Sequence, residues 1–348
     1  MESAPTPLTR WSRVAVIVAV VLGVPALLDQ GTAQRQPFDE RPLRALEKSR
    51  PRVVLIGDSM LETRIVQKQI DQLAGERWEV LAQPGSSSAI WYLMMKNLIA
   101  VQSPSPRVVI LFFRERQLTR PAQRTTGGYR KTIESYMSNS EPVVEKLLET
   151  SNQREQTRLE RIAMALYPVQ WRQEKWRDRL QNRALDLVAS SRDFQKIRDD
   201  TKEVFKLRNL RQDTGEDFES EERAKRVLDP SHEEFGTAIT DSFLPAILKI
   251  AREKNIHLIF FRVKGKPPTD GRSPSQPGEF EVYNRELRDY LEKAGAQYVD
   301  EIQNAGVTLK FYGSDDHVAP AMMKEYTELF WRDMSPRMPP ASAAAPDR

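Results

Sequence analysis

Short runs of apolar residues alternate with longer segments in which apolar residues recur at helical intervals. The runs 52–57 and 106–113 are nearly uninterrupted, which is typical of strands buried on both faces of a parallel sheet, and 78–85 is predicted to be a further strand between them. The segments between them, 61–75 and 86–100, have the spacing of helices. The order strand, helix, strand, helix, strand predicts the first half of an α/β domain.

The same rhythm returns near the carboxyl end. We expect a helix over 242–255, a strand over 256–263, a helix over 281–295, a strand over 296–301 and a last helix within 310–334. Alternating strands and helices favour right-handed crossovers and therefore a doubly wound parallel sheet in three α/β/α layers, of the flavodoxin-like kind. The predicted α/β domain consists of 52–129 and 242–334.

The segment between these halves, 130–241, differs in character. It is dense in charge and carries apolar residues at helical spacing, so we expect a long insertion of amphipathic helices. Trp171 and Trp176 lie there and are expected to pack between helices rather than to form a ligand or membrane surface. The tail 335–348 is rich in Pro and Ala and is expected to be disordered.

The amino-terminal 33 residues predict a targeting signal. Arg10 and Arg13 precede an apolar run over 14–28. A helix of that length spans roughly 22 Å, less than a hydrocarbon core of about 30 Å, so it suits a secretory signal or a marginal membrane anchor better than a full span. Cleavage after Ala33 fits the signal alternative, and a buried core helix is the competing interpretation. After a linker over 34–51, we expect the chain to lie outside the cytoplasmic membrane, anchored or secreted.

Composition narrows the chemistry. The chain has 53 Lys and Arg against 49 Asp and Glu, and the two signs are matched over most of its length. This argues against nucleic acid as a partner, because nucleic-acid binding usually requires a clustered basic face. Cysteine is absent, which excludes disulfides and thiolate chemistry. Any histidine-dependent mechanism must use His232, His257 or His317.

Three polar features follow this pattern of strands. Gly57-Asp58-Ser59 ends the first strand, Gly85 follows the second, and residues 315–317 (Asp-Asp-His) precede the last helix. The carboxyl ends of parallel strands meet at one edge of a sheet, so we expect these features to be neighbours. Ser59 is then either an ordinary helix cap or a serine presented for chemistry.

These segments resemble the SGNH (GDSL) hydrolase superfamily over 52–116 and 256–334. "VVLIGDSM" is similar to its first block, "LAQPGSSS" to its second and "DDHVAPAMMKEYTELF" to its last. The resemblance implies that Ser59 is the nucleophile and His317 its base, with backbone N–H groups of Ser59 and Gly85 forming the oxyanion hole.

The resemblance leaves two choices open. Many members place an aspartate three residues before the histidine, where this chain has Ser314. Asp315 has the spacing of the alginate O-acetyltransferase branch, whereas Asp316 would have to turn sharply to reach the neighbouring ring, so we expect Asp315 to orient His317. The asparagine of the usual third block is missing after the third strand.

Arginines stand where that asparagine is expected. Arg114 and Arg116 follow the third strand, and with Asp58 they are our candidate substrate-binding residues. An arginine there could donate to an oxyanion, bind an anionic group of the substrate, or simply pair with a nearby carboxylate. We expect no metal, because no second histidine accompanies Asp300-Glu301 or Asp315-Asp316-His317, and no cofactor.

The resemblance implies an exported serine acyl-ester enzyme. The favoured version transfers acetyl groups to or from a cell-envelope polysaccharide through an acyl-Ser59 intermediate, with a membrane-bound acyl-donor protein as partner and the N-terminal helix at the membrane. The alternatives are a generic exported esterase or lipase acting on small esters, and a noncatalytic envelope-assembly protein with a degenerate site.

Overall fold

The computed structural model describes residues 36–125, 128–155, 235–267, 278–313 and 315–339. The predicted signal or anchor and most of the predicted helical insertion lie outside these ranges and stay predictions. Within the described part of the chain, no helix has both the length and the apolar character needed to cross a bilayer.

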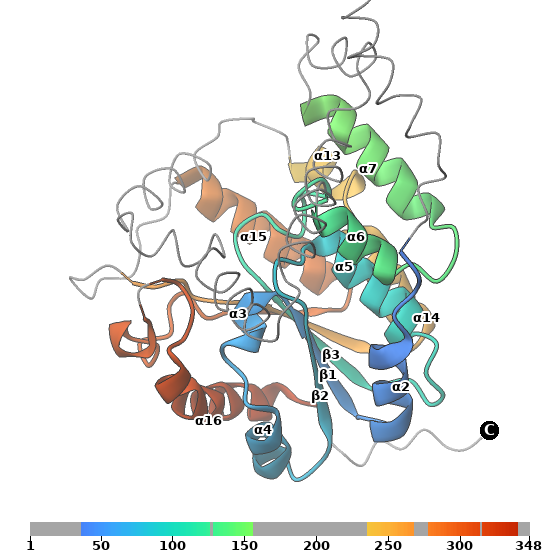
Figure 1. The fold of residues 1–348 in the computed structure, drawn as a ribbon. Helices are drawn as coiled ribbons and strands as arrows, with labels where there is room; N and C mark the ends of the chain where they lie inside the picture. Colours follow the sequence, from blue (N-terminus) through green and yellow to red (C-terminus); the bar gives the residue numbers. More distant parts are fainter. Residues whose placement is uncertain (1–35, 126–127, 156–234, 268–277, 314, 340–348) are drawn as a thin grey trace, which may run out of the picture. The chain divides into compact units, whose positions relative to one another are not determined.

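A five-stranded parallel sheet forms the centre of the described domain (Figure 1). Its spatial order is β2-β1-β3-β4-β5. The strands are β1 (Val53–Gly57), β2 (Trp78–Ala82), β3 (Val108–Phe113), β4 (His257–Arg262) and β5 (Gln297–Asp300). Because β2 and β3 flank β1 on opposite sides, the chain reverses direction across the sheet at β1. Ligands of doubly wound folds bind beyond the carboxyl end of the strand where this reversal occurs.

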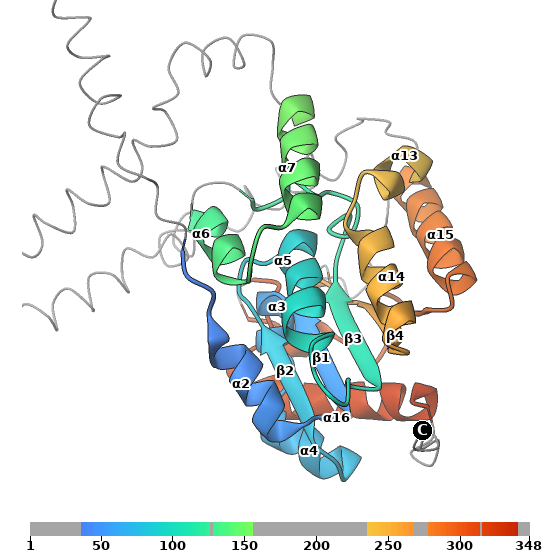
Figure 2. The ribbon, with the colours of Figure 1, turned by 90° about the vertical axis from the view of Figure 1, so that its right-hand side faces the viewer.

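Helices cover both faces of the sheet, which confirms the predicted α/β class (Figures 1 and 2). On one face lie α2 (Glu40–Ser49), α5 (Ser88–Leu93), the π-helix η1 (Met94–Ile99), α14 (Leu244–Glu253) and α15 (Gly278–Lys293). On the other lie α3 (Ser59–Glu62), α4 (Gln67–Ala74) and α16 (Met323–Met334). The remaining α-helices described are α6 (Gly128–Ser135), α7 (Pro142–Glu155) and α13 (Phe235–Thr240). Single 3₁₀ turns occur at η2 (Leu309–Phe311), η3 (Pro320–Met322) and η4 (Ser335–Arg337).

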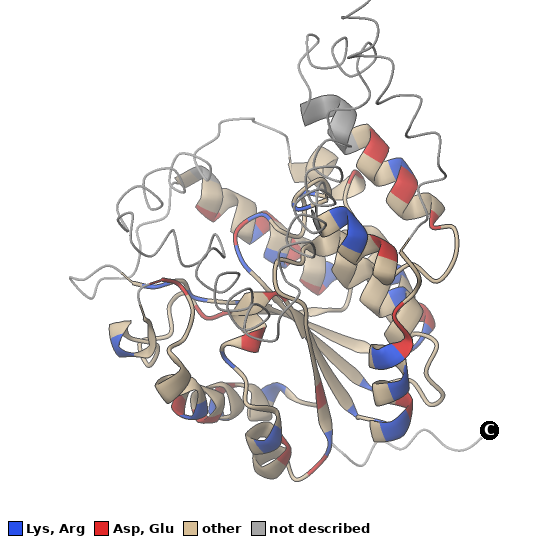
Figure 3. Ribbon diagram, in the orientation of Figure 1, with Lys and Arg blue, Asp and Glu red and all other residues tan. Residues whose placement is uncertain are grey.

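Two apolar cores explain why β1 and β3 are continuous apolar runs in the sequence. Val54 and Ile56 of β1 pack in the core beneath α5 and α14, whereas Val53 and Leu55 pack in the core beneath α4 and α16. All four side chains are fully buried. Successive strand residues point to opposite faces, so a sheet that is covered on both sides needs apolar residues at every position. Charged residues of both signs are interspersed on the helices, as Figure 3 shows.

Two predicted helices differ in detail. The segment 61–75 is not one helix, because α3 ends at Glu62 and α4 begins only at Gln67. Between them the chain turns Ile65 into the core, and Thr327 of α16 accepts the N–H of Val66 through its hydroxyl. The segment 86–100 begins as an α-helix and continues as a π-helix. Contacts with distant elements set the first boundary, and local periodicity does not report them.

Candidate active site

The turn after β1 presents Ser59 at the start of α3. Asp58 is the N-cap of that helix, and its Oδ1 accepts a hydrogen bond from the N–H of Met60 at 2.8 Å. Gly57 is needed for close packing, because a Cβ there would lie 2.7 Å from Cβ of Leu61 and 3.0 Å from Cβ of Phe112. Asp58 therefore fills the capping role that the sequence left open for Ser59.

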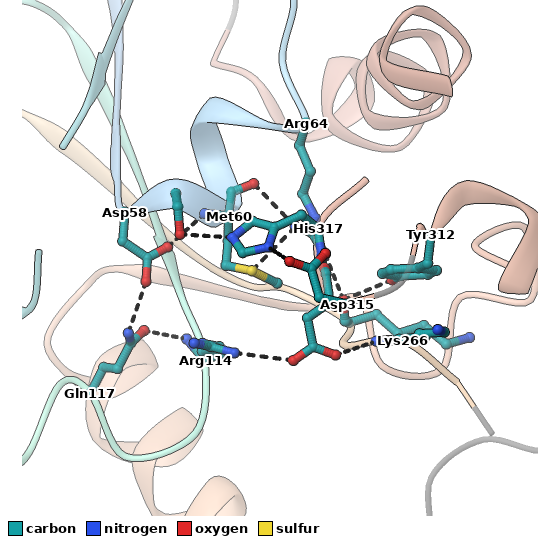
Figure 4. Close-up of polar contacts among 12 residues, drawn as sticks. Asp58, Met60, Arg64, Arg114, Gln117, Lys266, Tyr312, Asp315 and His317 are labelled. Atoms are coloured by element: carbon teal, nitrogen blue, oxygen red, sulfur yellow. Dashed lines mark hydrogen bonds and ion pairs between the residues drawn. The ribbon is translucent and has the colours of Figure 1, made fainter. Parts of the chain in front are cut away.

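The side chains of Ser59, His317 and Asp315 form a hydrogen-bonded chain (Figure 4). Nε2 of His317 lies 2.9 Å from Oγ of Ser59. Nδ1 of the same ring lies 2.8 Å from Oδ2 of Asp315, whose Oδ1 also accepts the backbone N–H of His317 at 3.1 Å. This is the geometry of a nucleophile, a base and an acidic group that orients the base.

Asp316 points away from this chain and holds the loop instead. Its Oδ2 accepts from Arg114 at 3.2 Å, and its Oδ1 accepts the backbone N–H of Lys266 at 3.0 Å. A bridge between Tyr312 and Val318 closes this loop, which we call the base loop (residues 312–313 and 315–318). The two aspartates thus have separate partners, and Asp315 is the one at the histidine ring.

Asp58 is enclosed rather than open to a substrate. It is only 2% exposed, and its Oδ2 accepts from Nε2 of Gln117 at 3.1 Å and from Arg124 at 3.4 Å. Oε1 of Gln117 in turn accepts the backbone N–H of Arg114 at 2.9 Å. In this arrangement the Asp58 carboxylate supports the turn, and substrate binding by Asp58 stays a prediction.

The two arginines after β3 have different surroundings. Arg114 reaches the base loop through Asp316 and keeps part of its side chain exposed. Arg116 lies over the ring of Tyr283 on α15, 5.3 Å from the ring centre. Burial raises the pKa of Tyr283 to about 12, so its ring is a neutral partner for the guanidinium. No described contact brings Arg116 to the triad.

Gly85 lies in a loop that is tied to the end of β1. Gln83 donates its N–H to the carbonyl of Gly57 at 3.0 Å, and Oγ of Ser86 donates to the same carbonyl at 3.2 Å. Nε1 of Trp91, which is fully buried, donates to that Oγ at 2.9 Å. Gly85 has a φ of +74°, and a Cβ there would lie 2.7 Å from Cε1 of Tyr129. The positive φ favours a glycine at this position, whereas the contact with Tyr129 involves an exposed side chain that can move aside.

The oxyanion role of Gly85 stays a prediction, but its donors are available. Among the residues that the structure describes, no group accepts a hydrogen bond from the backbone N–H of Ser59 or of Gly85. A tetrahedral oxyanion needs N–H donors that are not already engaged by the protein, and both groups meet that condition. In the described ranges, no cluster of three or more acidic or histidine side chains is arranged to hold a metal ion.

Sequence reasoning missed three residues that build this edge of the sheet: Arg64, Gln117 and Arg124. Gln117 and Arg124 lie in the loop after β3, where the missing asparagine was sought, but their spacing matches no motif. Arg64 falls in a segment that reads as a polar helix face, yet its side chain is completely buried.

Comparisons with known proteins add little to this geometry. No protein-family model matches the chain, and no curated protein matches it in sequence. Among solved structures, it is similar to a GDSL-like lipase from Bacteroides thetaiotaomicron VPI-5482, with 11% identity over 91% of this chain and 96% of that one and a TM-score of 0.36. It is also similar to a proposed acylhydrolase from Bacteroides fragilis NCTC 9343, with 10% identity over 88% of this chain and 94% of that one and a TM-score of 0.33. Both scores are low, so any functional argument rests on the side chains of this protein.

Proposed function

We propose that this protein is a serine enzyme that acts on acyl esters through an acyl-Ser59 intermediate. The supporting observation is the continuous chain from Oγ of Ser59 through His317 to Asp315, with both links under 3 Å. A serine hydroxyl is a weak nucleophile unless a base lies within hydrogen-bond reach. His317 lies at that distance, and Asp315 holds its ring so that Nε2 faces the hydroxyl.

The steps follow from this arrangement. Nε2 of His317 takes the proton of Ser59 as Oγ bonds to the ester carbonyl carbon. The carbonyl π electrons move to the oxygen, which is then bound by the N–H groups of Ser59 and Gly85; removing one such donor typically costs about 10²–10³ in rate. Collapse of this intermediate breaks the bond to the alcohol oxygen, which takes the proton from His317. Water or a second hydroxyl then repeats the sequence in reverse, and Ser59 is released.

The finer proposal is acetyl transfer to or from a cell-envelope polysaccharide. Two features support it: the Asp-x-His spacing of Asp315 and His317, and the apolar run 14–28, which suits export or anchoring of the domain. In this proposal the domain works outside the cytoplasmic membrane and receives acetyl groups from a membrane-bound donor protein. A generic exported esterase uses the same chemistry with water as the acceptor.

A serine-reactive fluorophosphonate and an aryl acetate test the enzyme proposal. We expect the wild-type protein to be labelled and to release acetate, labelling to vanish in Ser59→Ala, and both signals to fall strongly in His317→Ala. His257→Gln is the matched control, because His257 begins β4 at the opposite end of the sheet and should leave the rates unchanged. Folded wild-type protein that neither labels nor turns over ester would contradict the proposal and favour the noncatalytic alternative.

A second experiment separates transfer from hydrolysis. The acylated enzyme is mixed with envelope polysaccharide, and the products are followed by mass spectrometry. Mass added to the polysaccharide, dependent on Ser59, supports the transferase. Release of free acetate at the same rate with and without polysaccharide supports the esterase.

A further inference from the structure

Arg64 is the most deeply buried cation among the described residues of the catalytic edge. Its side chain has no exposed surface. Nη1 donates to the carbonyl of Met60 at 3.1 Å, and Nη2 donates to the carbonyls of Lys264 at 2.8 Å and Asp316 at 3.4 Å. These acceptors belong to three segments far apart in sequence. One guanidinium thus joins the nucleophile helix, the loop after β4 and the base loop (Figure 4).

Two tyrosine rings and a buried carboxylate near Arg64 stabilise its positive charge. The rings of Tyr326 and Tyr312 lie 5.4 Å and 5.8 Å from the guanidinium carbon. Glu301, also buried, accepts from the hydroxyl of Tyr326 at 2.6 Å and from the backbone N–H of Lys264 at 2.9 Å. Burial raises the pKa of Glu301 and Arg64 opposes that rise, so the two groups compensate each other across the Lys264 backbone.

Two of the carbonyls that accept hydrogen bonds from Arg64 belong to residues adjacent to the proposed nucleophile and base. Met60 directly follows Ser59, and Asp316 directly precedes His317. Carbonyl groups are part of the rigid backbone, so fixing these two also restricts the neighbouring side chains. A displacement of about 1 Å between reacting groups can cost around 10² in rate even when its source is remote from the chemistry.

We propose that Arg64 is a positioning residue that sets the distance between Oγ of Ser59 and Nε2 of His317. Its planar, multiply donating guanidinium holds three carbonyls at fixed angles, which a lysine ammonium does not reproduce. This role rests on the proposed acyl-ester function, because it concerns the alignment of that nucleophile and base. Arg64 touches neither substrate nor reacting atoms and acts through the backbone alone.

The test compares Arg64→Met and Arg64→Lys with wild type and with the control Arg52→Met. Arg52 is a suitable control because it is also largely buried and bound to Glu76 and to the carbonyl of Pro339, but at the other end of the sheet. For each folded variant we measure thermal stability, and kcat and KM for an aryl acetate. The NMR signal of the His317 Nδ1 proton, assigned by its loss in Asp315→Asn, reports the base directly.

For Arg64→Met we expect kcat to fall about 10²-fold, KM to change little, and the Nδ1 proton signal to broaden. Arg64→Lys should recover part of the rate. Arg52→Met should lose stability while keeping kcat and the Nδ1 signal. A merely structural role would make Arg64 variants resemble the Arg52 variant, so a folded Arg64→Met with wild-type kcat and an unchanged Nδ1 signal overturns the proposal.

Two safeguards keep the experiment decisive. If Arg64→Met does not fold, Arg64→Lys decides: a loss of roughly tenfold in kcat with a broadened signal supports the role, and wild-type values overturn it. If wild-type protein shows no turnover, the acyl-ester function fails by itself. The Nδ1 signal then still shows whether Arg64 holds the base loop.

Discussion

The turn that carries the proposed nucleophile (residues 57–60, the nucleophile turn) and the base loop (residues 312–313 and 315–318) meet at the proposed triad but are held in different ways. In the turn, Asp58 caps the helix by bonding to the N–H two residues later. In the base loop, Asp316 is held by Lys266 and Arg114, at sequence separations of 50 and 202. The bond from His317 to Ser59 spans 258 residues.

This difference indicates how substitutions in the two segments should affect stability and rate. The turn has a local cap, although Gln117 and Arg124 also donate to Asp58, so most of its geometry forms together with the adjoining strand and helix. A loop held by distant partners has the right geometry only when several strand ends are packed together. We therefore expect changes in the turn to appear mainly as lost stability, and changes around the base loop mainly as lost rate.

The largest effect on this comparison is expected from Asp315→Asn. The amide can no longer stabilise an imidazolium and favours the wrong ring tautomer, so kcat should fall about 10³–10⁴-fold with little change in stability. Steady-state kinetics and thermal unfolding together check this. Asp316→Asn is the matched control and should cost far less, because Asp316 bonds to Arg114 and Lys266 rather than to the ring. An equal fall in kcat in the two variants would contradict the separate roles that we assign to Asp315 and Asp316.

Gly57→Ala tests the turn. The added Cβ would come within 3.0 Å of two neighbouring Cβ atoms, so we expect a loss of about 1–3 kcal/mol in the free energy of unfolding, measured with urea. Gly236→Ala makes the same chemical change in α13, where a Cβ meets nothing within 4 Å, and should be neutral or stabilising. A Gly57 variant as stable as wild type would show that the close approach of β1 to α3 is not required.

The smallest effect is expected from Arg114→Gln. It removes the ion pair with Asp316, whose partners are partly exposed, so the gain from the pair is modest and salt-dependent. We expect kcat to fall about threefold to tenfold while the fold remains stable. Arg130→Gln breaks a comparable pair with Glu134 within α6 and should leave kcat unchanged. If Arg114→Gln raises KM instead, Arg114 binds substrate, as the sequence allowed.

Sequence reasoning reached much of the fold and part of the site. The strands were predicted because a sheet covered on both faces demands uninterrupted apolar runs, and β1 and β3 are of this kind. The meeting of Ser59 with His317 could be expected because parallel strands deliver their carboxyl ends to one edge. The break between α3 and α4 could not, because it depends on Thr327 in a helix more than 250 residues away.

For this protein, then, local pattern was enough to predict the class of fold, and the resemblance in three short blocks singled out Ser59, His317 and Asp315 as candidates. Only long-range packing decided the burial of Asp58, the separate partners of the two aspartates, and the position of Arg64 in a buried network. The physical reason is the distance along the sequence over which each kind of interaction acts. Periodicity and capping act over a few residues, whereas a buried charge is tolerable only where distant carbonyls and rings converge on it.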